Sequence, residues 1–486
     1  MCEHYVKCTK THFTFNVMLQ YESAFHMRMK YILLLAILIV IYSCEEKPQG
    51  TPGLKGVWNT IGYGKQFVVT DSIVEIYHLY EGGCSFDSQM PKDLFEKKYP
   101  VTRLTIDSLT IHVGITNYNF RRSNSKSAFC EKNFRSENPI VNFDALWNTF
   151  NEYYPSFELR GIDWQKSREK YRSRLDTRST DLELYTVLYE MTSELNDGHV
   201  RIEIPENLEN LFGKHHDEMK GLRDEVISKI NTKYVQNLKT YNKGNLNWGI
   251  IDGNIGYIQI NAFDELANYA IDNNLPRKEF WETYKNKAGE YANPSAADLN
   301  GIKQQMPKIF DDIKHTNSCI LDVRFNGGGW DAVGLEVLSY FTKNKVVAFT
   351  KKAKLKNGFT KLQTIFLEPN SNVYNGHLFI LTSPQTASAA ETFVIASLNL
   401  PNSTTIGSNT EGMLSDINDK KLPNGWEYGL SSEIYLSADG VNYEKIGVPP
   451  DFELNYPQKA KEFYNSLSSK LKKEDKAIEK VKEMSK

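Results

Sequence analysis

The chain of 486 residues lacks an excess of either charge. It has 58 lysine and arginine residues and 60 aspartate and glutamate residues, so its formal net charge at pH 7 is −2. Nucleic-acid binding needs a basic surface that neutralises phosphates, and this balance gives it no electrostatic support. No internal repeat is present either. The length allows two or three globular domains, for which we expect no nucleic-acid partner.

The N-terminal apolar run is too short to cross a membrane. It covers the eleven residues Ile32 to Tyr42, whereas a membrane-spanning helix needs about twenty. The basic stretch Met27-Arg28-Met29-Lys30 precedes it, and the small Ser43 follows it. This order predicts a secretory signal peptide over residues 27–43. Residues 1–26 match no targeting element, and we expect that they precede the true start codon.

Cysteine is scarce, with six residues in the chain. Cys2 and Cys8 fall within residues 1–26, and Cys319 lies in an apolar strand pattern that predicts an inert, buried thiol. Cys84 and Cys130 both fall in the N-terminal part of a chain with an export signal. Exported proteins fold in an oxidising environment where such pairs can form disulfides, so Cys84 and Cys130 are a candidate disulfide.

One serine follows an apolar strand pattern and precedes a helical one. Leu378 to Thr382 is apolar, and Ser388 is followed by Ala389-Ala390-Glu391. The free N–H groups and the positive dipole end of a helix favour developing negative charge, so Ser388 is a candidate nucleophile. Ser388-x-x-Glu391 also matches a capping box, in which the serine has a structural role. These residues alone leave both interpretations open.

Three glycines lie at an earlier strand-to-helix junction. The apolar strand pattern that begins at Cys319 runs into Gly327-Gly328-Gly329, and a helical pattern follows from Trp330. Glycines at such a junction expose N–H groups that form an anion nest or part of an oxyanion hole, although a plain tight turn is the alternative. The spacing matches neither G-x-G-x-x-G nor a phosphate loop that ends in Gly-Lys-Ser/Thr.

Together, these two units resemble the core of the S41 serine peptidases, which include tail-specific and tricorn-type proteases. Asp322 to Gly329 is similar to the family's D-x-R-x-N-x-G-G motif, and Thr386 to Glu391 is similar to its T-A-S-A-x-E nucleophile motif. The resemblance implies an α/β fold with a crotonase/ClpP-like S41 peptidase core. It also implies that the protein hydrolyses peptide bonds through an acyl-enzyme on Ser388.

The base that activates the serine differs between branches of this family. Tail-specific members use a lysine in a G-x-x-T-x-G-K stretch, but Met413 occupies that position here. A thioether cannot accept a proton at neutral pH, which argues against a Ser-Lys dyad. Residues 143–200 resemble the tricorn-type helical segment, and this places His199 on the catalytic histidine. Gly198 stands where tricorn has a serine of its tetrad.

The resemblance also assigns the remaining members of the site. Tyr443 to Asp451 is similar to the family's E-x-x-G-V-x-P-D ending, which makes Glu444 the third catalytic residue; a solvated carboxylate at a strand end is the alternative. The N–H groups of Gly328 and Ala389 are expected to form the oxyanion hole. The family implies no cofactor and no metal.

The signal region adds a prediction of location. Ile41-Tyr42-Ser43-Cys44 resembles a bacterial lipobox, which implies a lipid on Cys44. Glu45-Glu46-Lys47 resembles the acidic export signal of some Bacteroidetes lipoproteins. We therefore expect a protein that is anchored by lipid to the bacterial cell envelope, at the outer membrane.

The remaining patterns divide the mature chain into five parts. Short apolar runs between turn residues predict a small β-rich domain over residues 44–138. Apolar residues with a period near 3.6 predict a helical segment over 139–200. A polar helical insertion over 201–248 is too short for a PDZ domain. The peptidase core follows over 249–457, and a charged helix over 458–486 ends the chain.

One histidine cluster falls within the insertion. Lys214-His215-His216-Asp217-Glu218 contains residue types that bind metals. Adjacent histidines on a helix point in different directions, however, so the cluster predicts a solvated helix face.

Two classes of function remain on this fold. In the first, the protein is a serine endopeptidase or carboxyl-terminal processing peptidase whose partners are peptides or unfolded proteins, bound as an added strand. In the second, it is a non-catalytic peptide- or lipid-binding protein, and the joint presence of Ser388, His199 and Glu444 argues against this. A general α/β-hydrolase is disfavoured because Ser388 lacks a G-x-S-x-G elbow.

Overall fold

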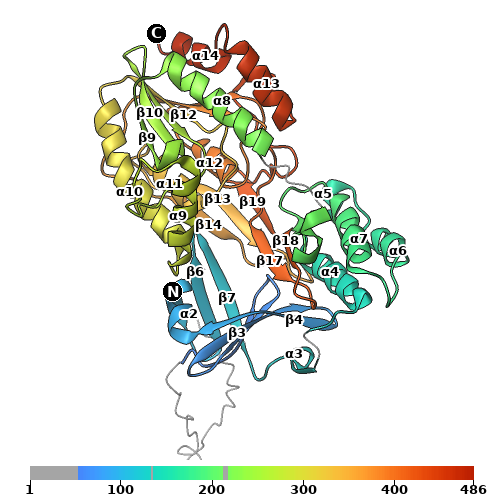
Figure 1. Cartoon of the computed structure of the whole chain (residues 1–486). Helices are drawn as coiled ribbons and strands as arrows, with labels where there is room; N and C mark the ends of the chain where they lie inside the picture. Colours follow the sequence, from blue (N-terminus) through green and yellow to red (C-terminus); the bar gives the residue numbers. More distant parts are fainter. Residues whose placement is uncertain (1–52, 133–134, 212–216) are drawn as a thin grey trace, which may run out of the picture. The chain divides into compact units, whose positions relative to one another are not determined.

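Four sheets organise the part of the chain that the computed structural model describes, residues 53–132, 135–211 and 217–486 (Figure 1). The predicted signal peptide, Cys44 and the pair His215-His216 lie outside these ranges. Within them, no helix is both long enough and apolar enough to pass through a bilayer.

The N-terminal part is a small β-domain with one antiparallel sheet, in the order β4-β3-β2-β1-β7-β6-β5. Its strands are β1 (Gly56–Thr60), β2 (Lys65–Val69), β3 (Ile73–Tyr80), β4 (Gly83–Pro91), β5 (Val101–Leu104), β6 (Ser108–Val113) and β7 (Thr116–Ser123). Helices α2 (Lys92–Lys98) and α3 (Ala128–Lys132) accompany them. Trp58, Phe67, Phe95 and Phe120 lie in its core. The domain thus has a hydrophobic core of its own.

Cys84 on β4 and Cys130 on α3 form a disulfide in this domain. The bond joins residues that are 46 positions apart. Closing a loop of this length reduces the entropy of the unfolded chain, which is worth up to about 4 kcal/mol at 25 °C. Cys319 is a free, buried thiol.

A helical segment follows the β-domain. It contains α4 (Pro139–Tyr153), α5 (Phe157–Arg160), α6 (Trp164–Arg172) and α7 (Asp181–Ser193). Helix α4 begins at Asn138, whose side chain accepts a hydrogen bond from the N–H of Ile140. Trp147 and Trp164 each donate their indole N–H to the other's carbonyl, at 3.0 and 3.1 Å. These buried aromatic contacts hold α4 and α6 together.

The core of the chain is built on a second sheet, in the order β20-β16-β15-β12-β11-β10-β9. Its strands are β9 (Gln236–Tyr241), β10 (Leu246–Ile251), β11 (Ile255–Ile260), β12 (Ser318–Asp322), β15 (His377–Thr382), β16 (Ser403–Gly407) and β20 (Phe452–Glu453). The strands from β11 to β20 pair in parallel, whereas β9 and β10 are antiparallel additions. The first strand of this sheet, β9, lies within the insertion predicted over 201–248. This strand is not predicted from the sequence, because β9 is exposed and polar and lacks an apolar pattern.

Helices pack around this sheet. The sheet shares one hydrophobic cluster with α10 (Pro294–Ile313), α11 (Asp331–Ser339) and α12 (Ala389–Ser397), whereas α9 (Arg277–Gly289) belongs to a separate small cluster. Two short 3₁₀ helices also occur, η1 (Glu206–Leu211) and η2 (Asn242–Gly244). Strand β12 is buried throughout and β15 is buried from Leu378 onward, as expected for parallel strands that are covered on both faces.

Two small antiparallel sheets connect the core with the parts before it. One has the order β14-β13-β19 and the other β17-β18-β8. Their strands are β13 (Val346–Ala353), β14 (Gln363–Leu367) and β19 (Glu433–Ser437), and then β8 (Arg201–Ile202), β17 (Ile417–Lys421) and β18 (Glu427–Ser431). Strand β8 directly follows His199, so its pairing with β18 brings the end of the helical segment to the core.

The C-terminal region contains two helices where the sequence predicts one. They are α13 (Ala460–Lys470) and α14 (Lys476–Met484), and α13 packs against α8 (Asp217–Tyr234) (Figure 1). Asp475 lies between them, and its carboxylate accepts hydrogen bonds from Arg324 Nη1 at 3.1 and 2.8 Å. Both residues are buried. The C-terminal region therefore supplies Asp475 as a buried ion-pair partner for Arg324, which follows strand β12.

Buried lysines hold the β-domain to the core. Lys420 on β17 donates to the carbonyls of Tyr63 and Gly64, and Lys351 on β13 donates to the hydroxyl of Thr116 at 2.7 Å. The β-domain is thus attached through specific polar contacts.

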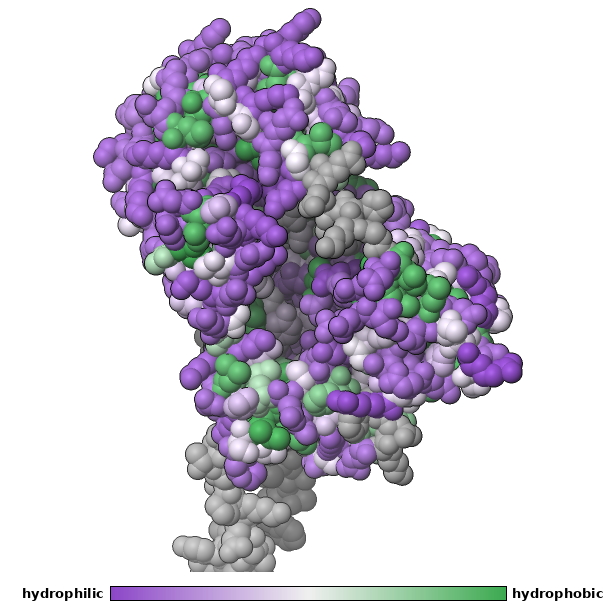
Figure 2. All heavy atoms as spheres, viewed as in Figure 1, coloured by the Kyte–Doolittle hydropathy of each residue, from purple (hydrophilic) through white to green (hydrophobic). Residues whose placement is uncertain are grey.

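The face drawn in Figure 2 is largely hydrophilic, and its hydrophobic side chains form small, separate groups.

Candidate active site

The glycine nest and Ser388 lie together because their strands are neighbours. Strands β12 and β15 pair in parallel, so the loops that follow them leave the same edge of the sheet. A Cβ added to Gly328 would stand 2.7 Å from Ser388 Cβ and 3.2 Å from the nitrogen of Ala389. Gly328 also has φ +115°, which favours glycine. Only glycine fits at this position.

Ser388 has an unusual backbone conformation, with φ 55° and ψ −125°. A non-glycine residue in this region is strained, and such strain persists mostly where the surroundings enforce it. Its N–H lies 3.0 Å from the Met413 carbonyl and 3.2 Å from Glu391 Oε2. The second contact is the glutamate half of the predicted capping box. Ser388 therefore stands at the N-terminus of α12 in a conformation that its neighbours hold.

Glu391 also fixes the loop that carries Met413. Its buried carboxylate accepts from the Thr410 hydroxyl at 2.6 Å and from the N–H groups of Gly412 and Met413, both at 2.7 Å. Burial raises the pKa of Glu391 to about 7, against the effect of these donors. Sequence reasoning assigned Glu391 only a capping role. The Thr410-x-Gly412 spacing after β16 is the sequence feature that could have indicated this contact.

Ser388 lines a cavity of about 290 Å³. The core contributes Trp330, Asp331 and Asp416 to its wall, and the β-domain contributes residues 113–116 and Tyr118. The β-domain thus forms one side of the space next to the nucleophile, a role that its sequence does not indicate.

Three carboxylates line this cavity, those of Asp331, Asp416 and Asp419. Burial raises the pKa of Asp331 to about 7, and the neighbouring charge of Asp416 adds to this; the Thr392 hydroxyl donates to Asp331 at 2.5 Å. Burial acts to raise the pKa of Asp416 as well, but Lys351 at 2.9 Å outweighs it, and the pKa is lowered. Asp416 is therefore ionised at neutral pH, whereas Asp331 is only partly ionised.

His199 lies between α7 and β8, where only 7% of the residue is exposed. Burial lowers its pKa, whereas the charges of Asp197 and Asp416 and a hydrogen bond to the main chain of Ser415 oppose this. Its Nδ1 is buried and has no hydrogen-bond partner among the described residues. The ring is therefore neutral at pH 7, the state in which an imidazole accepts a proton.

Gly198 packs directly against Met413. A Cβ on Gly198 would stand 1.9 Å from Met413 Sδ. These are the two positions at which the chain departs from the motifs of the tricorn-type and tail-specific proteases. Met413 thus occupies the space that a side chain at position 198 would need.

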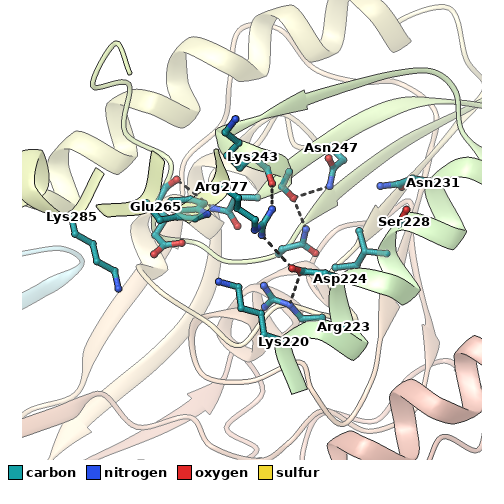
Figure 3. A pocket seen from close by; sticks show the side chains of 15 residues that line it. Lys220, Arg223, Asp224, Ser228, Asn231, Lys243, Asn247, Glu265, Arg277 and Lys285 are labelled. Atoms are coloured by element: carbon teal, nitrogen blue, oxygen red, sulfur yellow. Dashed lines mark hydrogen bonds and ion pairs between the residues drawn. The ribbon is translucent and has the colours of Figure 1, made fainter. Parts of the chain in front are cut away.

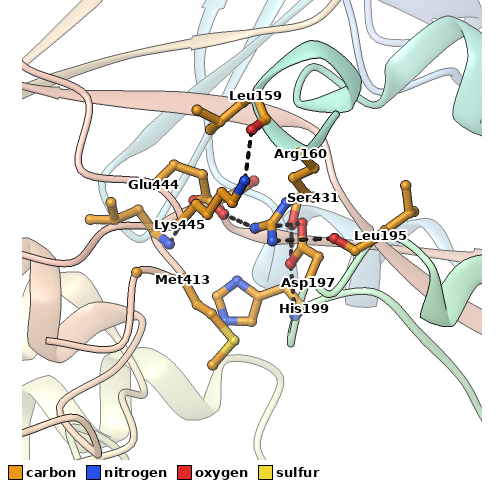
Figure 4. A network of polar contacts seen from close by, with 12 residues as sticks. Leu159, Arg160, Leu195, Asp197, His199, Met413, Ser431, Glu444 and Lys445 are labelled. Carbon is orange, nitrogen blue, oxygen red and sulfur yellow. Dashed lines mark hydrogen bonds and ion pairs between the residues drawn. The ribbon is translucent and has the colours of Figure 1, made fainter. Parts of the chain in front are cut away.

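Glu444 is held in an ion pair with Arg160 (Figure 4). Its Oε1 lies 2.5 Å from Arg160 Nη2, and its Oε2 accepts from the N–H of Leu414 at 3.0 Å. The same guanidinium lies 3.4 Å from Asp197 Oδ2, and Asp197 Oδ1 accepts from the main-chain N–H of His199 at 3.0 Å. Burial raises the pKa of Glu444, while Arg160 and Leu414 oppose this. Glu444 is thus a buried carboxylate, as distinct from a solvated one.

One short segment contacts all three predicted catalytic residues. The Met413 carbonyl accepts from the N–H of Ser388. The Leu414 N–H donates to Glu444, and the main chain of Ser415 lies close enough to the ring of His199 to raise its pKa. Residues 413–415 therefore position parts of the chain that lie up to 245 residues apart in sequence (444 − 199).

Comparison with known families matches the chain twice. The model of peptidase family S41 matches residues 254–454. Residues 254–454 belong to peptidase family S41. The model of the tricorn protease C1 domain matches residues 136–193, which end six positions before His199 (199 − 193). S41 members are serine peptidases, so the chain carries a serine peptidase domain.

Solved structures are similar to this chain to different degrees. A candidate peptidase from Parabacteroides merdae is 21% identical, covers 69% of this chain and 97% of its own, and has a TM-score of 0.51. The photosystem II D1 C-terminal processing protease is 14% identical over 69% of this chain and 99% of its own, with a TM-score of 0.39. The tricorn protease is 14% identical over 84% of this chain and 46% of its own, with a TM-score of 0.36.

The predicted oxyanion donors of the S41 domain differ in their hydrogen bonding. The N–H of Gly328 donates to Asn326 Oδ1 at 2.8 Å, and its carbonyl accepts from Phe263 at 2.7 Å. Ala389 is the first residue of α12, and its N–H has no acceptor in the part of the chain that the structure describes. The Ala389 N–H is thus free to meet a further acceptor, whereas the N–H of Gly328 is already bound to Asn326.

Proposed function

We propose that this protein hydrolyses peptide bonds of extended polypeptides, as an endopeptidase or a carboxyl-terminal processing peptidase. Ser388 is the nucleophile, His199 is the general base, and Glu444 is the third member of the site. The observation that carries this proposal is the segment 413–415, which hydrogen-bonds to Ser388 and Glu444 and lies close to the ring of His199.

The mechanism follows from the environment of each group. Neutral His199 takes the proton of the Ser388 hydroxyl, and the Ser388 oxygen attacks the substrate carbonyl carbon. The N–H of Ala389, joined by one from the glycine nest, binds the oxyanion at the N-terminus of α12. The protonated His199 gives its proton to the leaving amine, and water then hydrolyses the acyl-enzyme on Ser388. Loss of one oxyanion donor typically costs about 3 kcal/mol of transition-state stabilisation.

Glu444 acts in this proposal through its neighbours. Its charge holds Arg160, and Arg160 in turn lies against Asp197. The other oxygen of Asp197 accepts from the main-chain N–H of His199. This chain of contacts orients the loop that carries the imidazole. Glu444 is therefore a positioning residue, whose removal lowers the rate without removing the base itself.

We also place the activity at the cell envelope. The lipobox-like residues before Cys44 support a lipid anchor, and the acidic residues after it support the outer membrane. Cys44→Ala should move the full-length protein from the detergent phase to the aqueous phase on Triton X-114 partition. A variant that still partitions into detergent argues against an anchor on Cys44.

Labelling by a fluorophosphonate probe tests the nucleophile. The parent protein should label, whereas Ser388→Ala and His199→Ala should not. Ser469→Ala, which removes an exposed serine on α13, is the matched control and should label like the parent. An unlabelled parent, or a Ser388→Ala variant that labels equally well, excludes Ser388 as the nucleophile. A parallel digest of casein separates a peptidase from a binding protein on the same fold.

A further inference from the structure

A second cavity lies between α8, the η2 turn and α9 (Figure 3). Its volume is about 220 Å³, and it shares no lining residue with the cavity of Ser388. Twelve of its fifteen lining residues have polar or charged side chains. Neither the sequence motifs nor the proposed peptidase mechanism uses any of them.

The first property of this cavity is its positive charge. Five cationic side chains line it against two acidic ones, namely Lys220, Arg223, Lys243, Arg277 and Lys285 against Asp224 and Glu265. Lys243 is engaged by the carbonyls of Asn273 and Leu275, and Arg277 lies 3.6 Å from Asp224. Lys220 and Lys285 form no ion pair within the described residues. These two ammonium groups are therefore available to an anion.

The second property is a pair of buried acceptors without a donor. Asn231 and Asn261 line the cavity and are only 6% and 4% exposed. The Oδ1 atom of each has no hydrogen-bond partner among the described residues. A buried polar atom in this state costs about 1–3 kcal/mol, so such atoms normally meet a donor.

The orientation of both amides follows from their partners. Asn261 Nδ2 donates to the carbonyl of Gly244 at 2.7 Å, and a carbonyl can only accept. Asn231 Nδ2 lies 3.5 Å from Gln259 Oε1. Gln259 Nε2 donates to the Tyr257 hydroxyl, whose own proton goes to Asp322. This chain fixes Gln259 Oε1 as the acceptor, so the free atom of each asparagine is its oxygen.

We propose that this cavity binds a small carboxylate that carries hydrogen-bond donors beside its charge. The carboxylate would lie against Lys220 and Lys285, and its hydroxyl or N–H donors would meet Asn231 and Asn261. The half-buried ring of Trp281 forms an apolar wall. A uronic acid and the carboxyl-terminal residue of a peptide both have this chemistry, and the volume suits one such unit.

Calorimetric titration of the full-length Ser388→Ala protein, which cannot cleave a peptide, tests this site with two probes. D-Glucuronate represents the sugar acid, and N-acetyl-dialanine represents the peptide terminus. Methyl glucoside and N-acetyl-dialanine amide are their neutral counterparts. We expect one carboxylate to bind with a Kd of about 1 mM or lower, and its neutral counterpart to bind at least about tenfold more weakly. The probe that binds identifies the source.

Variants link the binding to this cavity. Lys220→Gln, Lys285→Gln and Asn261→Ala should each weaken the bound carboxylate by about tenfold. Lys278→Gln removes an exposed charge from the same helix as Lys285 but outside the cavity, and it should leave the Kd unchanged. The proposal is overturned if neither carboxylate binds at about 10 mM, if the neutral probes bind equally, or if the lysine variants do not weaken binding. Where glucuronate is the probe that binds, the parent and Ser388→Ala proteins should bind it equally, so that outcome is independent of peptidase activity.

Discussion

Met413 and Gly198 fit each other so closely that a Cβ on Gly198 would stand 1.9 Å from Met413 Sδ. Gly198 replaces the serine found in tricorn, and Met413 replaces the lysine of the tail-specific proteases. The two departures are adjacent in space, although 215 residues separate them (413 − 198). The missing side chain of Gly198, the neighbour of His199 in sequence, therefore leaves the space that Met413 fills.

Gly198→Ala should impair the enzyme through this contact. The φ of Gly198 lies outside the left-handed region, so alanine is compatible with the backbone and the clash with Met413 is the main cost. Overpacking of this kind costs about 1–3 kcal/mol, and we expect peptidase activity to fall at least about tenfold. Gly198→Ala combined with Met413→Ala should recover most of the loss in a kcat/KM assay. A double variant no better than Gly198→Ala alone would contradict the contact.

Met413→Lys should not raise the activity. His199 already supplies the base, and a lysine there would bring an ammonium group into a largely buried environment that disfavours charge. We expect kcat/KM to stay equal or to fall, whereas Met413→Leu, which keeps the volume, should stay within about threefold of the parent. A large gain for Met413→Lys would show that the protein belongs with the Ser-Lys branch.

Asp416→Asn should move the acid limb of the pH profile. The negative charge of Asp416 raises the pKa of His199, so its removal lowers that pKa and keeps the imidazole neutral to a lower pH. The decline of kcat/KM on acidification should therefore begin at a lower pH than in the parent. Lys351 retains Glu433 at 2.9 Å, which preserves its pairing. Asp439→Asn, in an exposed turn, is the control; a limb shifted upward would disprove the coupling.

Asp475→Asn should destabilise the core. Arg324 is fully buried, and the substitution removes one of its two carboxylate partners while the amide oxygen still caps α14. Removing one member of a buried ion pair typically costs about 3–5 kcal/mol. Urea unfolding measures this loss, and Glu474→Gln, at the exposed preceding position, should be neutral. Equal stability of Asp475→Asn and the parent would show that Asp322 suffices for Arg324.

The sequence predicts the S41 family, and its family model matches residues 254–454. It also predicts the α/β core and the small N-terminal β-domain that the structure contains. Local patterns carry these features, because strand, glycine nest and helix follow one another within a few residues around Gly328 and Ser388. The polar edge strand β9 and the break between α13 and α14 were missed, since neither has an apolar pattern of its own.

The sequence by itself determined which residue types are available for catalysis: a serine before a helix, a histidine after one, and no lysine at position 413. Only the tertiary structure decided how they are arranged. It showed that residues 413–415 contact Ser388, His199 and Glu444, that Arg160 holds Glu444, and that Asp475 reaches Arg324. The physical reason is distance along the chain. Hydrogen bonds and ion pairs between residues far apart in sequence depend on strand pairing and burial, and local composition does not encode them.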